Sequence, residues 1–173
     1  MAVTRLAQRG MLALRADLSV ANAQISDAFG LSVPAPLEVS KTDDLALLWF
    51  SPDELLLICD LTDLVSFKSR TEAALAGMHA MVTDVSDMRA SFELRGPRLR
   101  EVLAKTVPFD THPDRFRQGQ IRRTHLGQIA AAVWMLEQEC AQILCFSSYA
   151  SYAQDLLYAA CDPLARVGAV SAT

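Results

Sequence analysis

The segment Val82–Lys105 constrains the fold of this chain more than any other, because several structural signals follow one another in it. Asp84 and Asp87 flank a predicted tight turn, in which short polar side chains bond the backbone. The stretch Ser91–Leu94 then alternates polar and apolar residues, as a half-buried strand does. Pro97 fits the first turn of a helix, where its missing N–H costs nothing. The segment therefore predicts strand, turn, strand and helix.

Composition indicates a folded chain of one domain. The 173 residues are 51% apolar and 21% charged, which excludes disorder. The net charge of −4 disfavours a general nucleic-acid binder. We expect a single domain over residues 1–173, with a ferredoxin-like half at 1–87, a second α/β half at 88–162 and a frayed tail at 163–173.

The predicted elements of the first half follow the order strand, helix, strand, strand, helix, strand. A turn at Ser51–Glu54 joins the two middle strands into a hairpin, and the prolines of residues 31–41 predict a loop. The order is that of the split βαβ, or ferredoxin-like, unit. The elements are expected at residues 11–15, 19–29, 45–50, 55–59, 62–78 and 81–85.

The second half repeats part of this order, so the predicted fold class is α+β, with split βαβ units and antiparallel or mixed sheets. A loop is expected at residues 107–118. Ser147 and Ser148 are interpreted as caps of the last helix. The elements are expected at residues 88–94, 97–105, 120–126, 128–136, 141–146 and 148–160.

Three predicted strands are apolar on both faces: Leu45–Phe50, Leu55–Cys59 and the strand that contains Trp134. Half-exposed strands alternate, so these strands are expected to be covered on both faces or to lie at an interface.

The sequence contains no constellation that predicts catalysis. It has no glycine-rich phosphate loop and no Gly-x-Ser-x-Gly elbow. His79, His112 and His125 are scattered and do not form a metal-ligand pattern. We therefore expect no catalytic, cofactor-binding or metal-binding residues.

The apolar runs bear on where the protein is located, and the expected location in turn bears on the state of the cysteines. No apolar run is long enough for a membrane span or a signal-peptide core, so a cytoplasmic protein is expected. Cys140 and Cys145 are five positions apart in one predicted strand and point to opposite faces, which disfavours a local disulfide. Together with Cys59 and Cys161, they are expected to be reduced and mostly buried.

Asp84, Asp87 and Arg89 are the candidate residues of the predicted turn. The two carboxylates could act as an acid–base pair, but turn capping requires the same residues at the same spacing. We favour the structural interpretation, in which Arg89 pairs with one of the carboxylates.

Arg115, Arg117, Arg122 and Arg123 form a basic cluster within nine residues of an acidic chain. Arginine is common in interface ion pairs because its planar fork binds carboxylates at two points. The cluster is a candidate contact with a partner protein. The alternative is a solvated loop and a charged edge strand that resists aggregation. Nucleic acid is disfavoured by the net charge.

Four segments carry a resemblance to a known family. They are Trp49–Glu54, Asp84–Pro97, His125–Gln128 and Ser147–Tyr152. In combination they make residues 40–160 resemble the gamma subunit of heterotetrameric sarcosine oxidase. More distantly the chain is similar to the aminomethyltransferase (glycine-cleavage T-protein) and YgfZ-type fold.

The resemblance implies a noncatalytic subunit that assembles with alpha, beta and delta chains. It implies that FAD, FMN, NAD and tetrahydrofolate are bound by the larger chains, with no cofactor in this one. The sequence departs from T-proteins, because no acidic residue lies between Asp114 and Glu137, where their folate-site carboxylates stand. A stand-alone folate-binding aminomethyltransferase-like protein, or a subunit of a related complex that oxidises N-methyl amino acids, remains as the alternative.

Overall fold

The computed structural model of the chain describes residues 1–167. The chain forms two compact units. The first unit is Gln8–Ser86, and the second combines Met1–Ala7 with the chain from Asp87 onward. Each unit is an antiparallel sheet with two helices, so the predicted α+β class is confirmed.

The first unit has ferredoxin-like topology with one additional edge strand. Its sheet has the order β3-β4-β5-β2-β6, and all neighbouring strands are antiparallel. The elements are β2 (Gly10–Arg15), α1 (Leu18–Phe29), β3 (Val39–Lys41), β4 (Ala46–Ser51), β5 (Glu54–Cys59), α2 (Leu64–Ala74) and β6 (Met81–Asp84).

Local contacts define the ends of α1 and the hairpin in this unit. Asp17 caps α1 by accepting a hydrogen bond from Ser19 N, and the Gly30 N–H donates to Ser26 O at its end. β4 and β5 pair as the expected hairpin, with Leu48 opposite Leu56. Every residue of β5 is buried, which confirms that both of its faces are covered.

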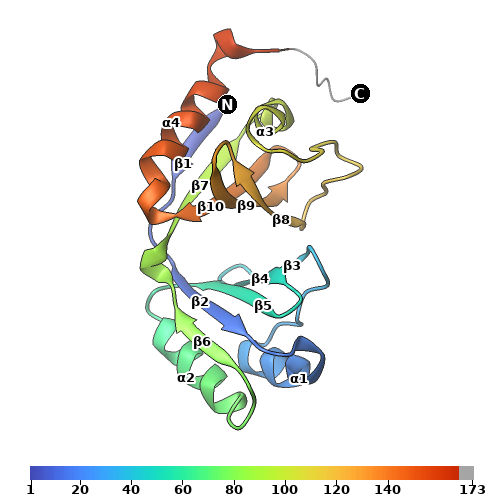
Figure 1. Cartoon of the computed structure of the whole chain (residues 1–173), viewed down its shortest axis with the longest axis vertical. Coiled ribbons are helices and arrows are strands. Elements are labelled where there is room, and N and C mark those ends of the chain that lie inside the picture. The colour runs from blue at the N-terminus through green and yellow to red at the C-terminus, as the bar shows by residue number, and fades with distance from the viewer. Residues whose placement is uncertain (168–173) are drawn as a thin grey trace. The chain divides into compact units, whose positions relative to one another are not determined.

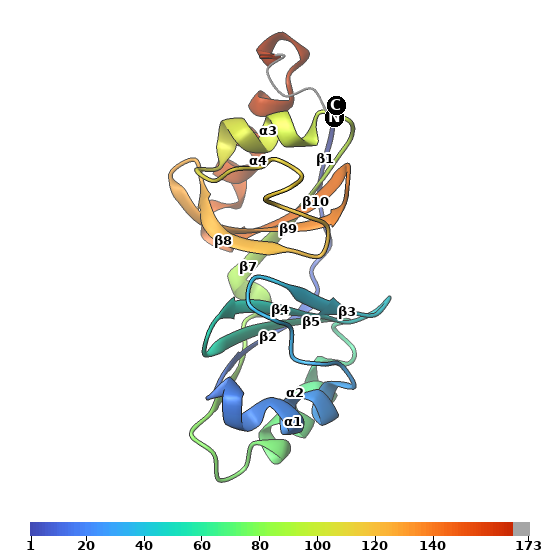
Figure 2. The ribbon, with the colours of Figure 1, turned by 90° about the vertical axis from the view of Figure 1, so that its right-hand side faces the viewer.

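Helices α1 and α2 cover one face of this sheet (Figures 1 and 2). Burial of one large apolar side chain contributes about 1.5–3 kcal/mol, so this layer supplies much of the unit's stability. At Gly10, β2 passes close to the end of β5, because a Cβ on this residue would lie 2.9 Å from both Asp60 O and Cys59 Sγ. The helix-facing core includes Leu12, Leu14, Ile25, Phe29, Leu47, Leu55, Leu57 and Leu64.

Two boundaries differ from the prediction. The helix expected over residues 62–78 is shorter, because it ends at Ala74 and Gly77 then takes a left-handed φ of 81°. The expected loop 31–41 contains strand β3, in which Ser40 lies opposite Leu47 of β4. Pairing with a neighbouring edge created this strand, and a three-residue segment has too little periodicity to reveal it.

The second unit repeats the same sheet. Its strand order is β1-β7-β10-β9-β8, again antiparallel throughout, and it matches β6-β2-β5-β4-β3 of the first unit. The elements are β1 (Ala2–Arg5), β7 (Arg89–Arg95), α3 (Leu99–Thr106), β8 (Ile121–Leu126), β9 (Ile129–Glu137), β10 (Cys140–Phe146) and α4 (Ala150–Cys161).

The N-terminal strand β1 occupies the position in the second sheet that β6 occupies in the first. Val3 lies opposite Leu94 of β7, so the first seven residues belong to the sheet of the second unit. The predicted boundaries place these residues in the half 1–87 instead. The pairing partner of β1 is distant in the chain, and no local pattern indicates it.

Helices α3 and α4 cover one face of the second sheet (Figures 1 and 2). Trp134 is buried as well, so β9 is covered on both faces as expected. Ser147 and Ser148 do not cap α4, because they form a short 3-10 turn without a side-chain capping bond. The helix-facing core includes Phe92, Leu94, Val102, Leu103, Val133, Ile143, Ala153 and Leu157.

Helix α3 also holds the segment after α4. Lys105 Nζ donates to Ala160 O at 2.7 Å and to Ala165 O at 3.0 Å. The Glu101 carboxylate accepts a bond from Val167 N at 2.8 Å. Residues 163–167 of the expected frayed tail are therefore bonded to a helix, and residues 168–173 lie outside the described part of the chain.

Candidate partner-binding surface

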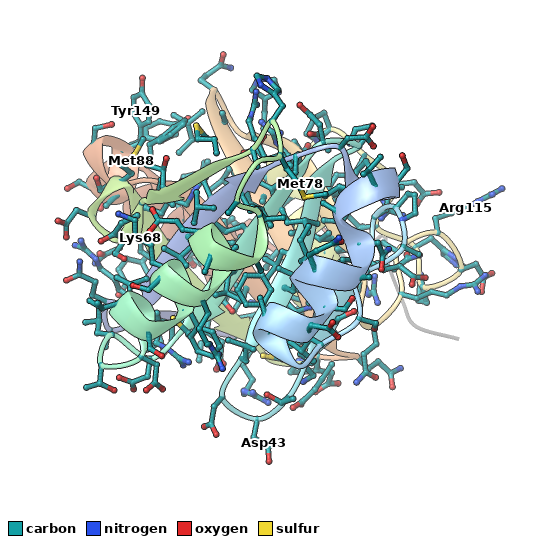
Figure 3. The ribbon with its side chains drawn as sticks, turned by 90° about the horizontal axis from the view of Figure 1, so that it is seen from below. Asp43, Lys68, Met78, Met88, Arg115 and Tyr149 are labelled. Atoms are coloured by element: carbon teal, nitrogen blue, oxygen red, sulfur yellow. The ribbon has the colours of Figure 1, made fainter. Side chains whose placement is uncertain are left out.

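The predicted basic cluster lies on the loop between α3 and β8 and on β8 itself. Arg115, Arg117 and Arg123 are exposed, and Arg115 points away from the ribbon (Figure 3). The Arg117 guanidinium donates to Asp114 O at 3.3 Å. These three residues place positive charge where a partner chain could contact it.

Arg122 differs from the other three because it is half-buried. Its Nη1 donates to Ile121 O at 2.8 Å, and its Nη2 donates to Arg115 O at 3.2 Å. The guanidinium carbon lies 5.4 Å from the centroid of the Phe116 ring. Arg122 therefore holds the loop against β8, in addition to any contact that it makes with a partner.

The fold adds Arg100 of α3 to this cluster. Its Nη1 donates to Thr111 O at 2.8 Å and to Phe116 O at 2.6 Å, and its guanidinium carbon lies 5.9 Å from the Phe116 ring centroid. Phe116 is fully buried and packs edge-on against Phe109. Arg100 was not among the predicted residues, because it stands outside the basic run in the sequence and only the path of the loop brings the two together.

Neither half-buried guanidinium has an acidic partner. Within residues 1–167, no ion pair includes Arg100 or Arg122. Burial lowers the pKa of both side chains. Guanidinium groups in proteins remain protonated at neutral pH. The nearby Asp114 carboxylate lies 3.6 Å from His112 Nδ1 instead.

The candidate turn at Asp84, Asp87 and Arg89 connects β6 of one sheet to β7 of the other through a short 3-10 helix, Ser86–Met88. Asp84 Oδ1 accepts bonds from Ser86 N at 2.9 Å and Ser86 Oγ at 2.6 Å. The buried Ser86 Oγ in turn accepts a bond from Met11 N at 3.0 Å. The Arg89 guanidinium lies 5.3 Å from the Phe146 ring. Through Ser86, these bonds connect the Asp84 carboxylate to the backbone of β2.

A surface cavity of about 580 Å³ lies at one end of the first sheet, beside Arg15, Asp17, Asp53 and His79. Its charged groups already have partners. Arg15 Nη2 lies 3.0 Å from Glu54 Oε2, Asp17 caps α1, and Asp53 Oδ1 accepts a bond from Ser51 Oγ at 2.5 Å. The cavity therefore does not present a free acid–base pair.

The remaining candidates for chemistry are dispersed. His79 borders the cavity, whereas His125 is exposed on β8. Three cysteines are buried, Cys161 is half-buried, and all four are free thiols. Among residues 1–167, no three His, Cys, Asp or Glu side chains are grouped so that they could hold a metal ion. In the same part of the chain, no helix has the length and apolarity needed to cross a membrane.

Comparison with known proteins gives the same family from sequence and from structure. A profile of the "sarcosine oxidase, gamma subunit family" matches residues 13–161. The sarcosine oxidase subunit gamma of Corynebacterium sp. (strain U-96) is 30% identical over 139 residues, which are 78% of this chain and 65% of that one. The chain thus spans slightly less than two thirds of that relative's length.

Among solved structures, a chain of the heterotetrameric sarcosine oxidase from Corynebacterium sp. U-96 superposes with a TM-score of 0.87 and 27% identity. The match covers 98% of this chain and 87% of that one. The glycine cleavage aminomethyltransferase T of Bartonella henselae shares the fold, with a TM-score of 0.65 and 13% identity over 90% of this chain and 44% of that one. The profile match and the superposition on the sarcosine oxidase chain together show that this chain belongs to the sarcosine oxidase gamma subunit family.

Proposed function

We propose that this chain is a noncatalytic gamma subunit of a heterotetrameric, flavin-dependent sarcosine oxidase, and that it assembles and stabilises the larger chains. The observation that carries the proposal is the superposition of nearly the whole chain on one subunit of such an oxidase. Its partners would be alpha, beta and delta subunits in the cytoplasm, and the larger chains would hold FAD, FMN, NAD and tetrahydrofolate.

The chemistry of the described residues supports a role in assembly. The histidines are dispersed, the thiols are mostly buried, and the carboxylates at the cavity are already bonded. Arg115, Arg117 and Arg123, in contrast, are exposed on one loop and the adjoining strand. We assign these three arginines, together with Arg122, to contact with an acidic surface of a larger chain.

The first test uses the isolated chain. The purified protein should show no visible flavin absorbance and should not oxidise sarcosine. A yellow preparation that oxidises sarcosine would overturn the noncatalytic assignment.

The second test measures assembly. The three exposed arginines are changed together to Ser, whereas Arg122 is kept because it holds the loop. Each exposed ion pair contributes about 0.2–1 kcal/mol, so single changes should have little effect while the triple variant weakens recovery of the larger chains. The control changes Lys41, Lys68 and Arg70 to Ser, which removes the same charge from the first unit.

Recovery is compared at low and high salt. Loss of the larger chains from the arginine variant alone, and weaker wild-type recovery at high salt, are the expected results. Equal recovery of both variants without salt dependence would show that these arginines form only a solvated surface.

A further inference from the structure

The ring of Phe116 lies close to two guanidinium groups that come from different elements. Arg100 extends from α3 and Arg122 from β8, and each guanidinium carbon is within 6 Å of the same ring centroid. Backbone carbonyls of the loop fix both groups. The two cations are therefore held in defined positions before any partner arrives.

Among residues 1–167, no acidic side chain forms an ion pair with either of these cations. Their hydrogen bonds go to neutral carbonyls and to Gln120 Oε1, which satisfy donors but do not neutralise charge. The Arg100 Nε–H is buried and has no acceptor. Half-buried charges are costly unless an opposite charge approaches, so the arrangement favours an anion at this position.

A carboxylate is better suited than a monatomic anion to neutralise Arg100 and Arg122. Its two oxygens match the planar guanidinium fork, and the exposed Arg115 and Arg117 on the same loop extend the positive surface around it. A carboxylate on a protein surface can bring neighbouring acidic groups to Arg115 and Arg117, whereas a small free carboxylate has no such neighbours.

We infer that the cluster of Arg100, Phe116 and Arg122 is the receptor for one Asp or Glu side chain of a larger partner chain. This inference rests on the assembly role proposed above and identifies the group that the partner presents. Arg100 is the new participant, because no sequence pattern assigns it to the surface.

The decisive variants are Arg100→Gln and Arg122→Gln, since glutamine is polar but carries no charge. The matched control is Arg98→Gln. Arg98 is also half-buried on α3 and donates to a backbone carbonyl, Cys161 O at 2.9 Å, away from Phe116. Thermal melting of each variant establishes that it is folded before assembly is measured.

Removing one partner of a charge pair that is buried at an interface weakens binding strongly. Each decisive variant should therefore bind the larger chains about 30-fold more weakly. The control should bind as the wild type does. Equal binding by all three variants, or equal loss in the control, would overturn the inference. Failure of the wild-type chain to bind the larger chains would instead refute the assembly role itself.

A second measurement does not depend on the stability of the variants. NMR signals of the arginine Nε–H groups are followed in the full wild-type chain during titration with sodium acetate or sodium chloride at matched ionic strength. Acetate should shift the Arg100 and Arg122 signals in a saturable manner while the Arg98 signal stays in place. Equal shifts with both salts would overturn the receptor assignment. Acetate saturation without any binding defect in the glutamine variants would assign the site to a free carboxylate and overturn the partner assignment.

Discussion

The hydroxyl of Tyr152 on α4 lies over Gly127 in the turn between β8 and β9. A Cβ added to Gly127 would stand 2.6 Å from that oxygen and 2.8 Å from Leu156 Cδ2. The adjacent Gln128 N–H lies 3.4 Å from the same hydroxyl and donates to it. The Gly127 N–H donates to Thr106 O at the end of α3. This turn therefore joins both helices of the second unit to its sheet.

Changing Gly127 to Ala should destabilise the second unit. Gly127 has a φ of +57°, and its Cβ would also displace the ends of the Tyr152 and Leu156 side chains, so we expect a loss of about 2–3 kcal/mol in the free energy of unfolding. Urea denaturation measures this loss. Gly119→Ala is the control, because its φ is +80° and its Cβ would meet no atom within 4 Å, so it should cost only about 1–2 kcal/mol. Equal losses would show that the Tyr152 contact is unimportant.

Changing Ser86 to Ala should destabilise the first unit by about 1–3 kcal/mol. The buried Met11 N–H would lose its acceptor, which is Ser86 Oγ at 3.0 Å. The variant should have a lower urea midpoint than Ser69→Ala, a change at an exposed position of α2. A midpoint equal to that of the control would mean that water replaces the hydroxyl.

Asp84 should make folding depend on pH in acid. Hydrogen bonds from Ser86 lower the pKa of its carboxyl from the ordinary value of 3.8. A folded-state pKa below the unfolded value means that this stabilisation is present above pH 3.8 and is lost as the pH falls through the folded-state pKa. Asp84→Ala should therefore flatten the curve of unfolding free energy against pH below about pH 4.

The control for this experiment is Asp43→Ala. Asp43 lies in an exposed turn of the first unit and is visible at its edge in Figure 3. A pH profile that changed equally in both variants would remove the Asp84 assignment.

The thiols should be protected in the folded chain. Burial raises the pKa of Cys59 and of Cys140 to about 11, so little thiolate forms at pH 8. Burial also raises the pKa of Cys161, but this residue is half-buried and should be labelled first by a thiol reagent. Labelling followed by peptide mass spectrometry gives the order, and denaturant should expose all four cysteines. Rapid native labelling of Cys59 would contradict the packing around β5.

Much of the fold could be predicted because its signals are local. Asp17 and Gly30 delimit α1, and the turn at Ser51–Glu54 sets the register of the β4–β5 hairpin. The ferredoxin-like order of the first unit then follows from the sequence of elements. Each of these features depends on residues a few positions apart, so hydrophobic periodicity and turn chemistry are sufficient.

The candidate surface was only partly predictable. The run that contains Arg115, Arg117, Arg122 and Arg123 is visible in the sequence because these residues are close in the chain. The sequence does not show which of these arginines is half-buried and which are exposed. Arg122 turns inward because the loop carbonyls and the Phe116 ring offer it partners, whereas Arg115 and Arg117 remain exposed.

The sequence by itself determined most of the elements, the hairpin and the basic run, since each arises from short-range preferences of the backbone and side chains. Only the tertiary structure decided that Ala2–Arg5 completes the sheet of the second unit, that Ser86 bonds Met11, and that Arg100 joins Arg122 at Phe116. These contacts join positions distant in the chain. Their formation depends on which strand edges and buried donors remain unpaired once the local elements have formed, and no local pattern records that.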